Sequence, residues 1–215
     1  VGGTMRKKIV ALCILVGLAL SACGGGNKST SESSKAATDG EPIEIVISHI
    51  VDENHTWHKG AEKFKEVAEE KSGGRLKISI YPNSQLGNEI DTIQSILTGG
   101  GCDITFTAES MQTYAEELGV IGMPYAIKSE KQLYNVLDGE VGKEMEDIML
   151  KSGMRVLGYF VRGPRNITSN TPIKTPDDLK GFIIRTPQSP MTVAAFEAMG
   201  AKPTPVSYTH LTLPT

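Results

Sequence analysis

The chain has 215 residues, of which 22 are basic and 25 acidic, and its formal net charge at pH 7 is −3. Hydrophobic residues make up 39% of it and charged residues 22%, a balance typical of a folded globular protein rather than a disordered one. Because the charge is negative and forms no basic stripe, nucleic acid is not an expected partner. Three cysteines are too few for a disulfide scaffold.

Residues 1–22 have the pattern of upstream residues followed by a secretory signal. Met5 is followed by three basic residues, 6–8, and by the apolar run 9–20, which is shorter than the roughly 18–20 residues that span a bilayer. Without those basic residues the acidic excess rises from three to six. The end of the run, Leu20-Ser21-Ala22-Cys23, resembles the lipobox of bacterial lipoproteins, which implies a lipid anchor on Cys23; the alternative is a plain signal with a chance cysteine.

Residues 23–41 are predicted to be the lipid anchor and a flexible tether, because Gly, Ser and Thr dominate and no apolar pattern is present. A tether of this kind places the folded part outside the cytoplasm and next to a membrane, either in a periplasm or on the outer face of a cell. Cys102 is then the one cysteine of the folded part, and it is expected to be a packed thiol rather than a nucleophile.

Strand and helix patterns alternate through the rest of the chain. Residues 76–80 alternate apolar and polar as a half-exposed strand does, and Gly139 and Gly142 are expected to weaken or break the longest helix. In chain order we predict a strand at 43–47, a helix at 57–71, a strand at 76–80, a helix over 90–97 ended by the glycines 99–101, a strand at 103–107, a short helix at 111–118, a polar helix at 130–151, a strand at 154–161, a helix start at 175–178, a strand at 182–185 and a helix at 191–199.

This alternation predicts an α/β fold with a largely parallel sheet, in which ligands bind at the carboxyl ends of the strands. The chain has no nucleophile elbow, phosphate-binding loop or paired Cys-x-x-Cys, and no cofactor is predicted. His49, His55 and His58 could ligate a metal together with nearby carboxylates, but no two of them stand four apart on a helix. Solvent-facing histidines in a helix-entry loop are the favoured interpretation, and a metal site is the alternative.

Two arginines stand where the expected strands end. Arg165 closes a turn containing Gly163 and Pro164, and Arg185 lies at the carboxyl end of the strand at 182–185. A guanidinium in such a place needs a partner, because uncompensated buried charge is costly. Its planar fork can hold a ligand carboxylate through two parallel hydrogen bonds, or it can form an internal salt bridge. Position alone leaves both interpretations open.

Six segments together resemble the solute-binding proteins of TRAP (tripartite ATP-independent periplasmic) transporters, the DctP or C4-dicarboxylate-binding type. They are 58–78, 80–89 (IYPNSQLGNE), 103–110 (DITFTAES), 164–170 (PRNITSN), 172–190 (PIKTPDDLKGFIIRTPQSP) and 200–206 (GAKPTPV). The resemblance implies a two-lobe α/β fold of the type II periplasmic binding proteins. It also implies a protein that performs no chemistry, binds an organic acid such as a dicarboxylate, uronate or sialic acid between its lobes, and delivers it to a membrane permease.

The resemblance also implies roles for four residues. Arg185 matches the arginine that pairs with the ligand carboxylate, and Arg165 matches a second pocket arginine. Glu109 falls where the family has a polar residue that contacts ligand hydroxyls or water, and His49 falls where members have a variable polar contact at the end of the first strand.

Members of that family continue beyond the P-T-P segment, so the chain is expected to be a fragment. The first lobe, 42–161, is expected to be nearly complete, the second lobe to be truncated to 162–208, and residues 209–215 to be a foreign tail. Such a fragment should bind solute weakly or not at all. The alternatives are a metal-binding lipoprotein that uses the histidines and a cell-surface enzyme, although no base–nucleophile pair is evident.

Overall fold

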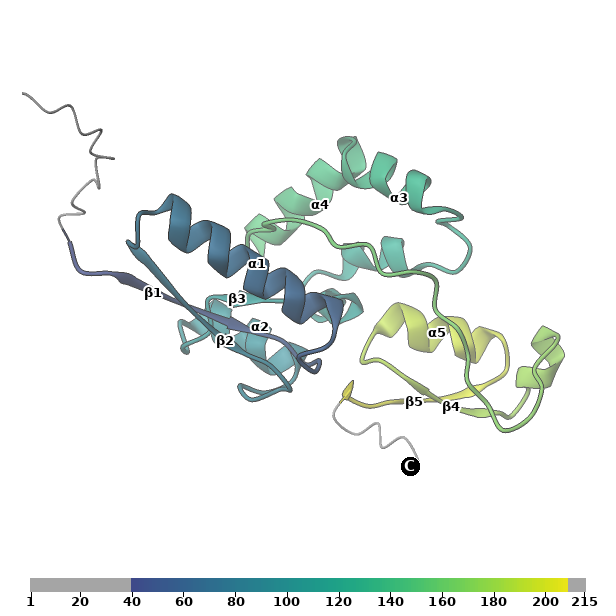
Figure 1. Ribbon diagram of the computed structural model, residues 1–215. Helices are drawn as coiled ribbons and strands as arrows, with labels where there is room; N and C mark the ends of the chain where they lie inside the picture. Colours follow the sequence, from purple (N-terminus) through teal and green to yellow (C-terminus); the bar gives the residue numbers. More distant parts are fainter. Residues whose placement is uncertain (1–39, 209–215) are drawn as a thin grey trace, which may run out of the picture. The chain divides into compact units, whose positions relative to one another are not determined.

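The computed structural model of the protein describes residues 40–208 (Figure 1). The predicted signal at 1–22, the predicted lipidation site Cys23, most of the predicted tether and the predicted tail at 209–215 lie outside the described residues. Within the described range, no helix combines the length and the apolar character that a membrane crossing requires.

Strands and helices alternate along most of the described chain, as the sequence predicts. In order they are β1 (Ile43–Ser48), α1 (Thr56–Lys71), β2 (Leu76–Tyr81), α2 (Glu89–Thr98), β3 (Ile104–Thr105), the 3-10 helices η1 (Glu109–Thr113) and η2 (Glu116–Gly122), α3 (Glu130–Leu137), α4 (Glu140–Lys151), the 3-10 helix η3 (Pro176–Leu179), β4 (Ile183–Thr186), α5 (Pro190–Ala198) and β5 (Lys202–Pro205).

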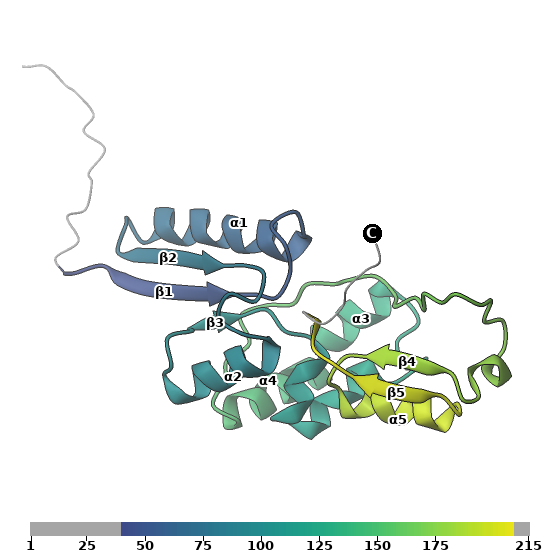
Figure 2. The same ribbon diagram turned by 90° about the horizontal axis from the view of Figure 1, so that it is seen from below.

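The strands form two parallel sheets, which confirms the predicted parallel pairing. The first has the order β2-β1-β3 and the second pairs β4 with β5. Helices α1 and α2 cover opposite faces of the first sheet (Figure 2). Ala61 of α1 packs against Ile47 and Ile78 on one face, and Thr92 of α2 bonds to Thr105 of β3 through their hydroxyls, 2.9 Å apart, on the other. The connections β1-α1-β2 and β2-α2-β3 each join parallel strands, so the carboxyl ends of all three strands lie at the same edge of the sheet.

Helix boundaries follow from local chemistry that is visible in the sequence. Asn88 caps α2 by accepting the backbone N–H of Ile90 and Asp91, and the Asp91 carboxylate accepts the N–H of Asn88 in return. Gly99 ends the same helix in the left-handed conformation, at φ 67°, which confirms its role as a helix stop. At the start of α5, the Ser189 hydroxyl oxygen caps the helix by accepting the backbone N–H of Thr192.

One helix prediction is confirmed together with its expected break, and another needs correction. The range 130–151 is two helices, α3 and α4, which meet at Asp138 and Gly139, so the break expected at Gly139 is confirmed. Gly142 lies in the first turn of α4, where an added Cβ would overlap the carbonyl oxygen of Leu137 at the end of α3. The expected short helix at 111–118 is instead η1 and η2, two 3-10 helices with poorer hydrogen-bond geometry.

The predicted strand at 154–161 is wrong, because these residues form no strand. Leu157 and Phe160 are 63% and 60% exposed, and no described strand pairs with this segment. An apolar alternation alone does not make a strand when no neighbouring strand supplies hydrogen bonds. The sequence also missed β5, where Pro203 and Pro205 argue against a strand; both lie in a sheet of only two strands, which tolerates proline.

Gly142→Ala tests the contact between α3 and α4. Helix propensity alone would make alanine about 1 kcal/mol more stable than glycine inside a helix. Because the new Cβ overlaps the Leu137 carbonyl, we expect instead a loss of about 3 kcal/mol in the free energy of unfolding, measured by urea denaturation. Gly158→Ala is the matched control, since its Cβ meets no atom within 4 Å, and a stabilised Gly142→Ala variant would contradict this packing.

Candidate binding site

A pocket of about 90 Å³, open to solvent on one side, lies where the strands of both sheets end. Ile50 follows β1, Glu89 follows the loop after β2, and Glu109 follows β3. Gln188 follows β4, and residues 206–208 follow β5. The pocket therefore occupies the position that the parallel topology predicts for a ligand.

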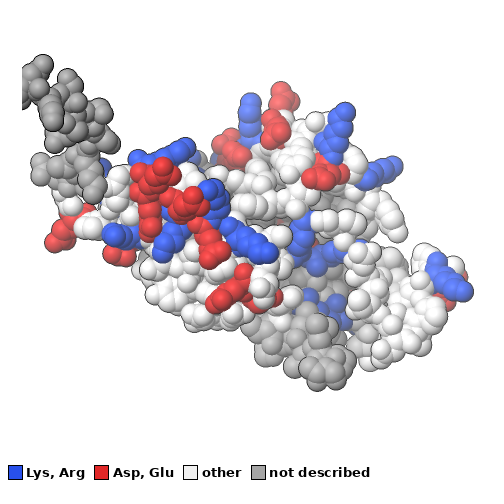
Figure 3. Space-filling model, viewed as in Figure 1, with Lys and Arg blue, Asp and Glu red and all other residues white. Residues whose placement is uncertain are grey.

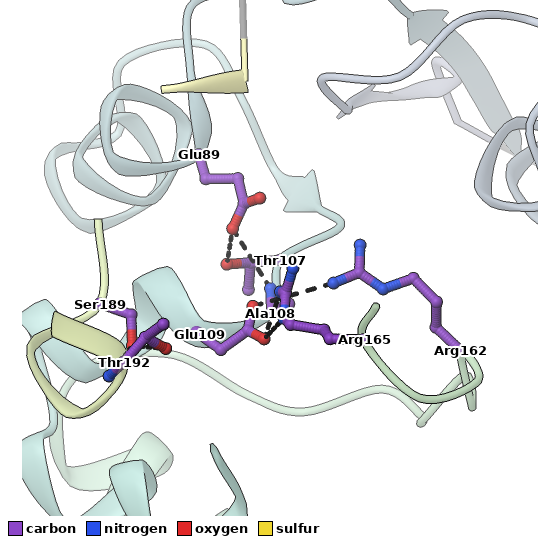
Figure 4. Close-up of polar contacts among 8 residues, drawn as sticks. All are labelled: Glu89, Thr107, Ala108, Glu109, Arg162, Arg165, Ser189 and Thr192. Carbon is purple, nitrogen blue, oxygen red and sulfur yellow. Dashed lines mark hydrogen bonds and ion pairs between the residues drawn. The ribbon is translucent and has the colours of Figure 1, made fainter. Parts of the chain in front are cut away.

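Glu109 and two arginines form a charge cluster on one wall of this pocket (Figure 4). Arg165 donates to Oε1 of Glu109 from both Nε, at 2.8 Å, and Nη2. Arg162 lies 3.9 Å from the other carboxylate oxygen and stacks over the ring of Trp57, with 5.6 Å between the guanidinium carbon and the ring centroid. Glu109 thus ties the turn at 162–165 to η1.

The cluster keeps Glu109 ionised. Its side chain is only 19% exposed, and burial by itself raises the pKa of a carboxyl group. The hydrogen bond and charge of Arg165, with a smaller effect of Arg162, outweigh burial and hold the pKa of Glu109 below its ordinary value. The carboxylate is therefore a fixed acceptor at neutral pH.

Arg185 reaches the pocket from β4 but forms no ion pair with the described residues. Its Nη2 donates to the carbonyl oxygen of Val206, at 2.6 Å, and its Nε is buried without a hydrogen-bond partner among the described residues. Burial, and next the charge of Arg165, lowers the pKa of Arg185. The structure thus separates the two arginines: Arg165 has an internal salt bridge, and Arg185 has none within the part of the chain that the structure describes.

Positive charge is visible within the hollow of the face shown in Figure 3, where blue atoms lie, whereas acidic and basic side chains are mixed over α1. The charged residues that line the pocket are Glu89, Glu109, Arg162, Arg165 and Arg185. Arginines outnumber carboxylates there, although the chain as a whole is acidic. A site with this balance attracts small anions.

His49 lies outside the pocket lining, unlike the other three residues predicted for the site. It directly follows β1, is 1% exposed, and shares a hydrogen bond of 3.0 Å between its Nε2 and Nδ1 of His58. Burial, and next the charge of His58, lowers the pKa of His49. The expectation that these histidines face solvent is wrong for His49, because its ring packs against Phe106. Residues 40–208 contain no group of three or more His, Cys, Asp or Glu that could hold a metal ion.

Sequence reasoning missed two charged residues of the pocket, Arg162 and Glu89. Arg162 stands in the same turn as Arg165, so a turn predicted to place Arg165 in the pocket could also have indicated Arg162. Glu89 is the first residue of α2 and accepts from the Thr107 hydroxyl at 2.8 Å and the Ala108 N–H at 3.2 Å (Figure 4). Glu89 follows the carboxyl end of β2, where ligands of parallel sheets bind, and this position in the sequence could have indicated a pocket residue.

Comparison with known proteins identifies the family. Residues 47–212 match the family of bacterial extracellular solute-binding proteins, family 7, or DctP, and the chain belongs to this family. The solute-binding protein RD1_1052 of Roseobacter denitrificans is 36% identical over 177 residues, which are 82% of this chain and 54% of that protein. The C4-dicarboxylate-binding protein DctB of Bacillus subtilis is 35% identical over 167 residues, 76% of this chain and 47% of that protein.

Solved structures confirm the fold class. The crystal structure of RD1_1052, a TRAP periplasmic solute-binding protein with bound L-galactonate, superposes with a TM-score of 0.75 at 34% identity and covers 80% of this chain and 57% of that chain. A TRAP periplasmic solute-binding protein of Sulfitobacter sp. NAS-14.1, with bound β-D-galacturonate, superposes with a TM-score of 0.72 at 28% identity. The superposition covers 77% of this chain and 55% of that chain. The predicted two-lobe, type II-like α/β fold is that of these proteins, and the chain spans about half their length. Solute binding, not catalysis, defines the family.

Glu109→Gln tests the charge cluster through the pH dependence of stability. A carboxyl group whose pKa is lowered in the folded state stabilises the fold above its unfolded pKa of about 4.3, and this contribution is lost as the pH falls through the lowered value. We expect the variant to be about 1–2 kcal/mol less stable at pH 7 and to lose less stability than the parent on acidification.

The measurement is urea denaturation at a series of pH values between 7 and 3. Glu70→Gln, which removes an exposed carboxylate of α1, is the control for general charge effects. Parallel stability curves for Glu109→Gln and the parent protein would show that Glu109 is not held ionised by the arginines.

Proposed function

We propose that the protein is the extracytoplasmic solute-binding subunit of a TRAP transporter and that it captures a small organic acid by pairing the acid's carboxylate with Arg185. The observation that carries this proposal is the state of Arg185, a pocket guanidinium with a buried Nε that lacks a partner and with no ion pair among the described residues. A buried donor without a partner is costly unless a ligand supplies the acceptor.

The chemistry of the guanidinium suits this role. Arginine stays charged at any physiological pH, and its planar fork matches a carboxylate through two parallel hydrogen bonds. The solved relatives named above carry a sugar acid, either galactonate or galacturonate, and DctB is named for C4-dicarboxylates, so each of them points to an acid ligand. These names support an organic acid as the solute.

Glu109 and Arg165 have a second role in the proposal. Because they neutralise one another, they contribute little net attraction, but their remaining lone pairs and N–H groups can bond to ligand hydroxyls or to bridging water. The polar contact expected at His49 is not part of this proposal, since Ile50, and not His49, lines the pocket.

The transport steps complete the proposal. Lobes corresponding to 42–161 and 162–208 close on the acid, remove water from the ion pair and thereby strengthen it. The loaded protein delivers the acid to the membrane permease of the transporter. A lipid on Cys23 and the tether up to residue 41 would hold the protein at the membrane surface while it collects solute.

Arg185→Ala and Arg185→Lys test the ion pair in the complete gene product. We expect alanine to abolish binding of the acid with little change in unfolding free energy, and lysine to weaken binding at least about 100-fold, because an ammonium lacks the planar fork. Affinity is measured by isothermal titration with the acid that a thermal-shift screen selects. Ligand at about a hundred times Kd adds roughly 2.7 kcal/mol to stability, which such a screen detects.

Arg75→Lys, at an exposed arginine next to β2, is the matched control and should bind as the parent does. Near-normal affinity of Arg185→Lys would refute the two-bond contact. If no acid from a panel of dicarboxylates, uronates, aldonates and sialic acid stabilised the parent protein, the proposed function itself would fail.

A further inference from the structure

We infer that Gln112 is a positioning residue for solute binding, because it ties the start of α5 to η1 and so fixes the segment that carries Arg185. The inference rests on the proposed function and deepens it by naming a residue that acts on the ligand only through Arg185. It is drawn from a hydrogen bond between residues 79 positions apart.

The first turn of α5 takes one of its acceptors from outside the helix. The first backbone N–H groups of any helix have no partner within that helix. The N–H of Thr192 is accepted locally, by the Ser189 hydroxyl at 3.3 Å. The N–H of Met191 is instead accepted by Oε1 of Gln112, also at 3.3 Å. A side chain of η1 therefore completes the cap of α5.

Two glycines of η2 make room for the Gln112 amide. The side chain of Gln112 is buried, with 4% of the residue exposed. An added Cβ at Gly119 would lie 3.2 Å from its Oε1, and one at Gly122 would lie 3.4 Å from its Nε2. Because the amide is packed this closely, it cannot follow Met191 freely, and the hydrogen bond holds α5 in place.

One short helix thus holds two later segments of the chain. Side chains three positions apart in a 3-10 helix lie one above the other, and Glu109 and Gln112 stand three apart in η1. Glu109 bonds to Arg165 and fixes the turn at 162–165. Gln112 bonds to Met191 and fixes the start of α5. The charged contact and the uncharged contact therefore act from the same face of η1.

The held end of α5 is directly connected to the pocket. From Arg185 in β4 the chain runs to Met191 in α5 through Pro187 and Gln188, and both of these connecting residues line the pocket. Two parallel hydrogen bonds to a carboxylate require the guanidinium fork to keep its position, because a small displacement weakens both bonds. Release of the start of α5 should therefore weaken the ion pair with the solute.

Hydrogen exchange tests the bond in the complete gene product without any ligand. We expect the Met191 N–H, followed by NMR, to exchange at least about tenfold faster in Gln112→Met than in the parent protein. The Thr192 N–H is the internal control, because its acceptor is Ser189, and its exchange should not change. Unchanged exchange at Met191 would overturn the inference.

Two substitutions of Gln112 separate positioning from packing. Methionine fills a similar space without an acceptor, whereas glutamate keeps an acceptor whose charge the N-terminus of α5 favours. The Nε2 of Gln112 has no acceptor among residues 40–208, so glutamate loses no bond there. In isothermal titration with the selected acid we expect Gln112→Glu to bind within about threefold of the parent and Gln112→Met at least about tenfold more weakly. Packing alone predicts the reverse order, which would overturn the inference.

The uncharged amide of the acid identifies the group through which Gln112 acts. Because an amide lacks the charge that pairs with Arg185, Gln112→Met should weaken its binding less than about threefold, and equal losses for acid and amide would contradict a role through Arg185. Gln94→Met is the matched control. This exposed glutamine of α2 accepts from the Tyr114 hydroxyl at 3.4 Å outside the pocket lining, and the variant should bind as the parent does.

The outcomes separate this inference from the proposed function. An acid that binds equally to the parent protein, Gln112→Met and Gln112→Glu would overturn the inference and leave the proposed function intact. Absence of binding of every acid to the parent protein would overturn both, even if exchange at Met191 revealed the hydrogen bond.

Discussion

The ion pair between Glu109 and Arg165 is the interaction on which the rest of the site depends. It joins η1, which follows β3, to the turn that precedes the second sheet, and it neutralises one arginine of the pocket. Because Glu109 satisfies Arg165, the two arginines, which their positions in the sequence alone could not distinguish, have different partners in the structure. Arg185, held from β4, bonds to the Val206 carbonyl and has no acidic partner within residues 40–208.

Parallel pairing explains why residues far apart in the chain reach this ion pair. In a parallel sheet every strand ends at the same edge, so the segments after β1, β2 and β3 converge there, and β4 and β5 repeat the arrangement in the second sheet. Helices α1 and α2 bury the two faces of the first sheet and leave its carboxyl edge for side chains that bind. The family defined by comparison is one of solute-binding proteins, so a pocket at this edge is consistent with the proposed function.

Much of this could be predicted from sequence, because local signals determined it. Asn88, Gly99 and Ser189 mark helix ends by hydrogen bonding and by backbone conformation, which neighbouring residues alone decide. The strand expected at 154–161 failed because pairing depends on a distant partner, and β5 was missed because proline looks unsuitable until its place in the sheet is known. The ion pair of Glu109 could not be predicted either, since it joins residues 56 positions apart.

The most direct test of the account asks whether Arg185 recognises the carboxylate itself. Affinities of the parent protein and of Arg185→Ala are measured for the bound acid and for its uncharged amide, by isothermal titration or by competition. The account predicts that the substitution weakens binding of the acid at least about 100-fold and of the amide less than about threefold, because the amide lacks the charge that Arg185 pairs with. Equal losses for acid and amide would show that Arg185 supports the pocket without touching the carboxylate, and would contradict the account.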